Sequence, residues 1–237
     1  MLITGAAGGI AHATAQLMAK SGANVALSDI NPEALQKVAD ELSDSTGKIS
    51  WHVSDIGDAA SCQQLVEAVA KQHGAIDHLV HAAGIYPEVL VADMTDADWQ
   101  KLMRINLDGT FYICRAIIPF LGEASSIVNL ASLAAHRGSF SHAHYSASKG
   151  AVISFSRSLA LELAPKTRVN AVSPGIIETP MTAGLLRQKG AALLDSTPLK
   201  RFGTAEDVAG SIVFLCSPLA NFITGETLQV NGGLYMS

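Results

Sequence analysis

Short apolar segments rich in β-branched residues alternate along the chain with longer segments in which apolar residues recur every three or four positions. The short segments predict strands and the long ones predict amphipathic helices, because side chains repeat about every two residues along a strand and about every 3.6 along a helix. The predicted strands occupy residues 1–4, 24–30, 48–53, 76–84, 125–132, 168–175 and 226–233. The predicted helices occupy residues 11–22, 32–43, 59–74, 96–121, 144–165 and 205–216.

This alternation indicates an α/β fold, a doubly wound parallel sheet of about seven strands with helices on both faces. No linker, repeat or low-complexity segment divides the sequence, so residues 1–237 are expected to form a single domain. The first strand is the weakest element, since only four residues precede Gly5 and a central strand normally has about five or six. Its shortness leaves open whether residues precede Met1 in the natural chain.

Composition and charge narrow the class of partner. The chain has 237 residues, 49% of them hydrophobic and 16% charged, which is enough apolar material for one sizeable core. A formal net charge of −5 without basic runs argues against nucleic acid or an anionic membrane, and favours a small molecule. No segment approaches the roughly 18 apolar residues of a membrane span, and no signal peptide is recognisable. Cys62, Cys114 and Cys216 lack the spacing of a disulfide framework or zinc site, so we expect a soluble, cytoplasmic protein without a metal.

A glycine-rich segment, TGAAGGIA at residues 4–11, lies between the first predicted strand and the first predicted helix. Gly5 and Gly9 permit a tight turn and the close backbone approach that a pyrophosphate needs, and the helix N-terminus then offers free N–H groups to the phosphates. A glycine-rich turn in this place is also an ordinary structural device, so the segment alone does not decide.

Asp29 adds the missing context, because it ends the second strand 24 residues after Gly5. A carboxylate there accepts both hydroxyls of an adenosine ribose and repels a 2′-phosphate. No Lys or Arg lies in TGAAGGI or SDINPE to receive that phosphate, so NAD is expected rather than NADP. The alternative is that Asp29 is a turn or capping residue before Asn31 and Pro32.

Tyr145 and Lys149 lie four residues apart in a predicted helix and therefore share one face. A tyrosine can serve as base for an alcohol proton and as acid for a carbonyl oxygen, provided that its pKa falls from about 10 toward about 7, which takes about 4 kcal/mol. A nearby ammonium favours the phenolate, and Lys149 also has donors for ribose hydroxyls. Such pairs are common on helices, so the pair does not decide by itself.

Together these residues resemble the short-chain dehydrogenase/reductase family, and the resemblance covers nearly the whole chain. The family's TGxxxGxG motif corresponds to TGAAGGIA, its YxxxK motif to Tyr145 and Lys149, and its catalytic serine to Ser132, thirteen residues before the tyrosine. RINLDG and SPGIIET match its segments around the structural asparagine and the nicotinamide. Two departures stand out: Ala11 replaces the last glycine, and HAAG, beginning at His81, replaces NNAG. The second departure removes an asparagine that supports the family's central sheet.

The resemblance implies a Rossmann fold that binds a nicotinamide dinucleotide and transfers a hydride, with tyrosine as general acid and base. The implied catalytic residues are Asn106, Ser132, Tyr145 and Lys149. The residues expected at the cofactor are Gly5, Gly8, Gly9, Ile10, Asp29, Ile30, Asp55, Ile56, Ala83, Gly84, Tyr145, Lys149, Pro174, Gly175, Ile177 and Thr179. Among these, Asp55 corresponds to the family's adenine-contacting aspartate, and Ile177 is expected to meet the nicotinamide carboxamide through its backbone.

Several of these residues have ordinary structural alternatives. Ser132 either holds the substrate oxygen beside the tyrosine or caps the next segment. Asn106 either fixes, through its main chain, a water that relays protons to the lysine, or simply interrupts its helix. Thr179 either binds the nicotinamide carboxamide or a phosphate, or forms an N-cap. His142 and His144 are expected to be solvated loop residues, with a place at the substrate mouth as the alternative.

The substrate is less well defined by the sequence. Residues 181–201 are expected to form a lid, whose leucines at 185, 186, 193 and 194 either cover an apolar substrate or make core and subunit contacts. SPGIIETPMT and ITGETLQVNGGLYM resemble segments of the 3-oxoacyl-[acyl-carrier-protein] reductases. Those enzymes usually take NADPH and dock an acidic carrier protein through basic residues at two places, which here hold Glu123 and Lys166.

The expected function is therefore NAD(H)-dependent interconversion of a secondary alcohol and its ketone by hydride transfer. The alternative is a 3-oxoacyl-[acyl-carrier-protein] or acyl thioester reductase, and a more remote one is a redox sensor that binds NAD without turnover. Helices equivalent to residues 99–120 and 145–163 are apolar around much of their circumference, and in the family such helices pair across a two-fold axis. A homotetramer is expected, with a dimer as the fallback.

Overall fold

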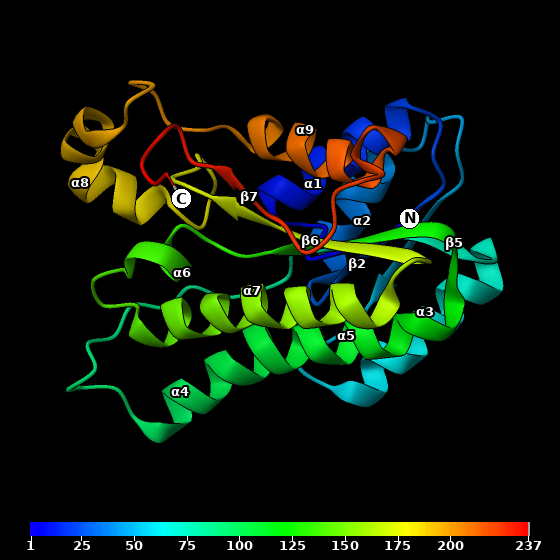
Figure 1. The fold of residues 1–237 in the computed structure, drawn as a ribbon, viewed down its shortest axis with the longest axis horizontal. Coiled ribbons are helices and arrows are strands. Elements are labelled where there is room, and N and C mark those ends of the chain that lie inside the picture. The colour runs from blue at the N-terminus through cyan, green and yellow to red at the C-terminus, as the bar shows by residue number, and fades with distance from the viewer. Residues whose placement is uncertain (237) are drawn as a thin grey trace.

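The centre of the fold is one parallel sheet, seen in the computed structural model, which describes residues 1–236 (Figure 1). Ser237, which the expected domain includes, lies outside the described residues, as do the side chains of residues 188 and 189. The described strands follow the order β3-β2-β1-β4-β5-β6-β7 across the sheet. Their bounds are β1 Leu2–Thr4, β2 Val25–Asp29, β3 Ile49–Val53, β4 Ile76–His81, β5 Leu121–Leu130, β6 Thr167–Pro174 and β7 Thr227–Val230.

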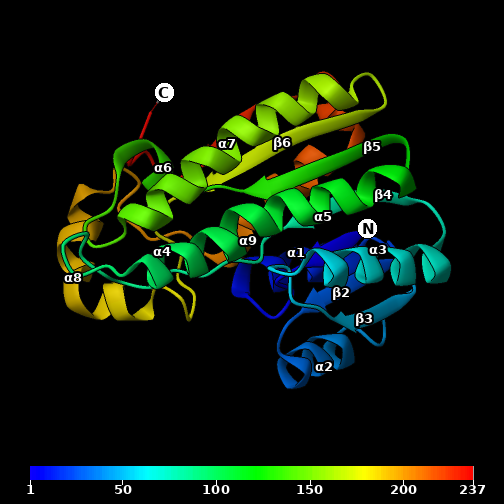
Figure 2. The same cartoon turned by 90° about the horizontal axis from the view of Figure 1, so that it is seen from below.

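Helices cover both faces of the sheet, as the two views show (Figures 1 and 2). One face carries α1 (Gly9–Lys20), α2 (Pro32–Glu41) and α9 (Ala205–Cys216), and the other carries α3 (Ala59–His73), α5 (Gly109–Ile117) and α7 (Ala143–Leu163). The remaining α-helices, α4 (Asp96–Met103), α6 (Ala134–Arg137) and α8 (Ala183–Ser196), lie toward the end of the molecule where the strands finish. The predicted fold class is confirmed.

Two apolar layers hold the helices to the sheet, because successive strand residues point to opposite faces. Ile3 and its neighbours Leu27 and Val80 pack toward α1, α2 and α9. Leu2 and Leu79 pack on the other face, toward α3, α5 and α7. All five side chains are fully buried. Although β1 has only three residues, it therefore contributes to both layers and pairs with β2 and β4.

The strand order reverses between β1 and β4, since the chain first moves outward to β2 and β3 and then returns to the other side of β1. The helices that follow β1 and β4 lie on opposite faces of the sheet, so a crevice remains between them at the carboxyl ends of these two strands. Gly5 follows β1 at this place, and the segment after His81 follows β4.

The helix predicted at residues 96–121 is divided in the structure. It consists of α4, a π-helical turn η1 (Arg104–Asp108), α5 and a 3-10 turn η2 (Ile118–Phe120), after which β5 begins at Leu121. Pro119 explains the end, because proline has no N–H to continue the helix. The π-helical turn confirms that the helix is interrupted around Asn106. The sequence prediction also missed α6, which has only four residues.

Candidate active site

A cleft of about 640 Å³ opens at the carboxyl edge of the sheet, where the strand order reverses. Asn106 is buried next to this cleft, and Ala83 lies between Ala82 and Gly84, which both line the cleft. Four expected residues lie at the ends of β2 and β3 at the same edge but do not line the cleft: Asp29, Ile30, Asp55 and Ile56. The expected residues that line the cleft are Gly5, Gly8, Gly9, Ile10, Gly84, Ser132, Tyr145, Lys149, Pro174, Gly175, Ile177 and Thr179.

The glycine-rich loop has the backbone that close approach requires. Gly5 has a φ of +68°, and a Cβ there would lie 2.7 Å from the Cα of Ala83. Gly8 is the N-cap of α1 and, having no side chain, makes no capping hydrogen bond to the N–H groups of the first helical turn. A Cβ on Gly9 would meet Thr179 at 3.0 Å. This loop and helix N-terminus fit the pyrophosphate of a dinucleotide.

Asp29 makes the turn contact of its structural alternative, while its role at the ribose stays a prediction. Its Oδ2 accepts from the Ala7 backbone N–H at 3.1 Å, which ties the glycine-rich loop to the end of β2. Its Oδ1 accepts from the Asn31 N–H at 3.1 Å, a turn bond, while Asn31 itself caps α2. Each carboxylate oxygen has a second lone pair, so the group can still accept ribose hydroxyls. Ile30 beside it is 64% exposed.

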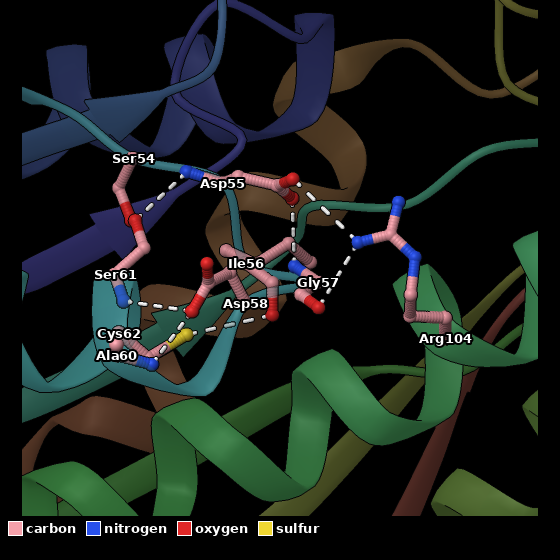
Figure 3. Close-up of polar contacts among 9 residues, drawn as sticks. All are labelled: Ser54, Asp55, Ile56, Gly57, Asp58, Ala60, Ser61, Cys62 and Arg104. Carbon is pink, nitrogen blue, oxygen red and sulfur yellow. Dashed lines mark hydrogen bonds and ion pairs between the residues drawn. The ribbon is translucent and has the colours of Figure 1, made fainter.

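Asp55 lies in the loop after β3 and is contacted both from within that loop and by Arg104 (Figure 3). Its Oδ1 accepts from the Gly57 N–H at 2.8 Å, and its Oδ2 lies 3.6 Å from Nη1 of Arg104. Ile56 is buried and packs against the first residue of α5, where a Cβ on Gly109 would lie 2.8 Å from Ile56 Cδ1.

Tyr145 and Lys149 share one face of α7 as predicted, but their electrostatics differ from the expectation. Burial raises the pKa of Tyr145 to about 12, and its hydrogen bond with Ser132 only partly offsets this. Burial also lowers the pKa of Lys149 to about 8. The expected depression of the tyrosine pKa is therefore wrong for this chain by itself, because Nζ of Lys149 lies 5.8 Å from the tyrosine ring centroid and donates instead to the Leu130 carbonyl at 2.6 Å.

Ser132 forms a local cap and Asn106 lies in the turn that interrupts its helix, as their structural alternatives predict. Both residues also lie near Tyr145 and Lys149. Ser132 Oγ accepts from the Ala134 N–H at 3.1 Å, a local cap, and hydrogen-bonds Tyr145 as well. The Asn106 side chain accepts from the Ile85 N–H at 2.9 Å and donates to the Ile85 carbonyl at 3.0 Å. Asn106 thereby fixes the segment after β4, and its main-chain carbonyl accepts from Thr110 at 2.8 Å.

The segment after β6 closes one side of the cleft. Gly175 is needed where the chain crosses Asn231, since a Cβ would lie 2.7 Å from the Asn231 Cα. The Ile177 side chain is buried, and its carbonyl accepts from the Thr182 hydroxyl. Thr182, not Thr179, is the N-cap residue of α8. Thr179 instead lies over the glycine-rich loop through its contact with Gly9, which favours its expected place at the cofactor.

The sequence analysis missed Tyr86, whose ring lies 4.6 Å from that of Tyr145 in an edge-on contact. Tyr86 also stacks on His142 at 3.8 Å and hydrogen-bonds Ser139 at 3.3 Å through its hydroxyl. Glu88 lies 3.9 Å from His142 and lines the same cleft. Tyr86 follows the HAAG segment by two residues, and that position was the only available signal.

His142 and His144 are not the solvated loop residues that we expected. Both are buried, since His142 is 2% exposed and His144 is fully covered. His142 lines the cleft, which agrees with its alternative as part of the substrate mouth. His144 lies in the N-terminal turn of α7 and does not line the cleft.

Helix α8 forms within residues 181–201, the segment expected to be a lid, although only part of it faces the cleft. Leu185 and Leu193 line the cleft, whereas Leu186 and Leu194 do not. All four are half-buried. The first pair therefore supports a role in covering the substrate, and the second pair does not.

His81 replaces the family's asparagine without leaving β4 unsupported. Its Nδ1 lies 2.7 Å from the Thr4 hydroxyl, which joins β4 to β1 through side chains. Burial lowers the pKa of His81 to about 3, and the charge of Lys149 acts in the same direction. The folded protein therefore holds this imidazole neutral throughout the physiological range.

This burial predicts a loss of stability in acid. In the unfolded chain His81 takes up a proton below about pH 6.5, whereas in the folded chain it stays neutral until about pH 3. The free energy of unfolding therefore decreases progressively as the pH falls below 6.5. His81→Asn should lose less stability between pH 7 and pH 4 than the wild type, by about 2–3 kcal/mol. Urea unfolding at both pH values measures this, and His78, whose pKa burial lowers to about 4, is common to both proteins. Equal losses in the two proteins would contradict the assignment.

The described residues contain no group of three or more His, Cys, Asp or Glu side chains placed to hold a metal ion. None of their helices combines the length and apolar character needed to cross a membrane.

Comparison with known proteins agrees with this geometry. The model of a family described as Enoyl-(Acyl carrier protein) reductase matches residues 5–235. The 3-oxoacyl-[acyl-carrier-protein] reductase FabG of Thermotoga maritima is 39% identical over 236 residues, which cover 98% of this chain and 96% of that protein. The Escherichia coli protein of the same name is 35% identical over 238 residues, covering 99% and 96%.

A solved structure from Brucella melitensis, described as a short-chain dehydrogenase/reductase and glucose/ribitol dehydrogenase, is 51% identical. It superimposes with a TM-score of 0.97 and covers 100% of this chain and 96% of that one. These relatives confirm an oxidoreductase that acts on CH–OH groups with a nicotinamide cofactor. The chain belongs to the short-chain dehydrogenase/reductase family.

Proposed function

We propose that the protein interconverts a 3-oxo compound and its secondary alcohol by hydride transfer, with Tyr145 as the acid and base. The observation that carries this proposal is that Ser132 and Tyr145 line the same cleft as the glycine-rich loop, with the Ser132 side chain close enough to lower the pKa of Tyr145 against the effect of burial. A hydroxyl pair in this position can hold a carbonyl oxygen and exchange a proton with it.

Each residue of the site has a separate role in the proposed reaction. In the direction of reduction, Tyr145 donates its proton to the carbonyl oxygen while Ser132 holds that oxygen by a hydrogen bond. The high pKa of Tyr145 keeps it protonated before the reaction, and the ammonium of Lys149 stabilises the phenolate that remains. Asn106 keeps the wall after β4 in place through Ile85. The cofactor, when bound, supplies or accepts the hydride at its nicotinamide ring.

We further propose NAD(H) as the cofactor, on the strength of Asp29. Its carboxylate ends β2 beside the glycine-rich loop and would meet the adenosine ribose there. A 2′-phosphate would bring a second anion against it in a half-buried groove. The resemblance to the 3-oxoacyl-[acyl-carrier-protein] reductases favours NADPH instead, whereas the carboxylate of Asp29 favours NADH.

Asp29→Arg, or Asp29→Ala combined with Ile30→Arg, should shift the ratio of kcat/KM values toward NADP by at least about tenfold, or about 1.4 kcal/mol. The substitutions remove the repulsion and add a cation that can pair with the phosphate. Steady-state kinetics with both cofactors on one shared substrate measures the shift. An unchanged ratio would mean that Asp29 does not face the ribose.

The names of the relatives favour a 3-oxoacyl thioester over other ketones. Two observations favour a free small substrate instead. Glu88, Arg137 and His142 make part of the cleft polar, whereas an acyl chain needs only an apolar lining. In addition, Lys166 lies 3.9 Å from Glu123, so the one basic residue at the expected docking places already has an acidic partner.

A substrate panel separates these candidates. It should contain a 3-oxoacyl thioester of acyl-carrier protein, the same thioester of coenzyme A, a 3-oxo ester and simple secondary alcohols, each tried with both cofactors and followed by nicotinamide absorbance. A kcat/KM for the carrier-protein thioester far above the others would support the acyl reductase. A higher value for a free alcohol or ester would support the second candidate, and turnover of none would contradict the proposal.

We also propose that the protein assembles as a homotetramer. The support is an exposed set of aromatic side chains on the outer helices α4 and α5, where Trp99 and Phe111 are 42% and 41% exposed. Phe155 of α7 lies in edge contact with Phe111, so the same surface continues onto α7.

A further inference from the structure

The loop that carries Asp55 is held in place by contacts from two sides (Figure 3). On one side, α3 holds it: the Asp55 N–H donates to Ser61 at 3.1 Å, and Cys62 donates to the Ile56 carbonyl at 3.4 Å. On the other side, a single long side chain reaches it from the π-helical turn η1. That side chain is Arg104, whose Nη1 donates to the Gly57 carbonyl at 3.0 Å and lies 3.6 Å from Asp55 Oδ2.

The fit between Arg104 and the loop is close. A Cβ on Gly57 would lie 2.5 Å from Arg104 Nη1, so the guanidinium occupies the space that any other residue at 57 would need. Gly57 is also the residue whose N–H binds Asp55 Oδ1. Arg104 therefore contacts the carboxylate on one oxygen and, through Gly57, supports the turn that orients the other.

Arg104 also links this loop to the catalytic end of the molecule. It is the first residue of the same π-helical turn that contains Asn106, which fixes the wall of the cleft through Ile85. A π-helical turn inserts an extra residue and thus changes the direction of the side chains around it. Within this turn, the side chains of Arg104 and Asn106 reach two different loops of the cofactor edge.

We propose that Arg104 is a positioning residue for the adenine end of the cofactor: it holds Asp55 and the Gly57 turn in the geometry that binds the adenosine moiety. This inference rests on the proposed dinucleotide site, in which Asp55 meets the adenine. Arg104 has no part in hydride or proton transfer, so its effect should be confined to ligands that carry adenosine.

The test is binding calorimetry with two fragments of the cofactor, ADP-ribose, which carries adenosine, and reduced nicotinamide mononucleotide, which does not. Arg104→Met should raise the Kd for ADP-ribose by about three- to tenfold, the range for losing a partly exposed charged contact together with one hydrogen bond. The Kd for the mononucleotide should change by less than about twofold. Arg104→Lys keeps the charge but not the planar fork, and should fall between the wild type and Arg104→Met.

Two further variants make the result specific. Lys101→Met removes an equal charge one turn earlier on α4, from an exposed side chain, and should leave both dissociation constants unchanged. Asp55→Asn should weaken ADP-ribose binding, and adding Arg104→Met to it should cost less than in the wild type, because the two residues act together.

The outcomes separate the inference from the proposed function. If the wild type does not bind ADP-ribose, both the proposed dinucleotide site and the inference about Arg104 are wrong. If Asp55→Asn weakens ADP-ribose binding while Arg104→Met and Arg104→Lys do not, the inference alone fails. Additive effects of the two substitutions, or equal losses for both fragments, would also overturn it, because Arg104 would then act without Asp55 or through general folding.

Discussion

Tyr145→Phe should lower kcat by about 10²- to 10⁴-fold and leave the Kd for NAD nearly unchanged, since general acid–base catalysis is typically worth that range. The substitution removes only the hydroxyl that Ser132 holds and leaves the ring in its edge-on contact with Tyr86. Steady-state rates and a binding titration on the same preparation separate the two quantities. More than about a tenth of the wild-type rate would mean that the proton leaves by another route.

Tyr86→Phe is the matched control for that experiment. It removes a second phenol hydroxyl from the same cleft, one that hydrogen-bonds Ser139 and not Ser132. The loss of rate should be much smaller than for Tyr145→Phe. If the two losses were equal, the position of the hydroxyl beside Ser132 would have no special importance.

Lys149→Met should reduce kcat by about 10²-fold or more and raise the Kd for NAD by about tenfold. The ammonium is buried near Tyr145, where its charge can stabilise a phenolate, and its remaining donors can reach ribose hydroxyls. Methionine keeps most of the buried aliphatic stem, so the fold should tolerate the change. A lower rate with an unchanged Kd would retain the electrostatic role and remove the role at the ribose.

The fold class and the positions of most strands and helices follow directly from local patterns that the sequence displays. Alternating short and long apolar segments, with glycine after the first strand and Asp29 after the second, are sufficient because each depends on residues close together in the chain. The helix around Asn106 is where this reasoning failed in detail. Its apolar periodicity continues through residues 96–117, while the π-helical turn depends on packing against the loops at 55–57 and 85, which are distant in sequence.

The candidate site shows the same limit. The motif residues lie along the cofactor edge, and most of them line one cleft, but the burial that raises the pKa of Tyr145 and lowers that of Lys149 comes from the whole fold and has no local signal. Tyr86 and His142 stack across a long separation in sequence, so no spacing rule could pair them. Arg104 reaches Gly57 from 47 residues away, and only the structure reveals that contact.

The most direct test of the account is the ratio of kcat/KM for the wild-type protein with NADH and with NADPH on one shared 3-oxo substrate. Asp29 beside the glycine-rich loop predicts a preference for NADH of at least about tenfold, or about 1.4 kcal/mol. A preference for NADPH would contradict it. Asp29 would then serve only to hold Ala7 and Asn31, and a reductase of the carrier-protein type would become the better description of the enzyme.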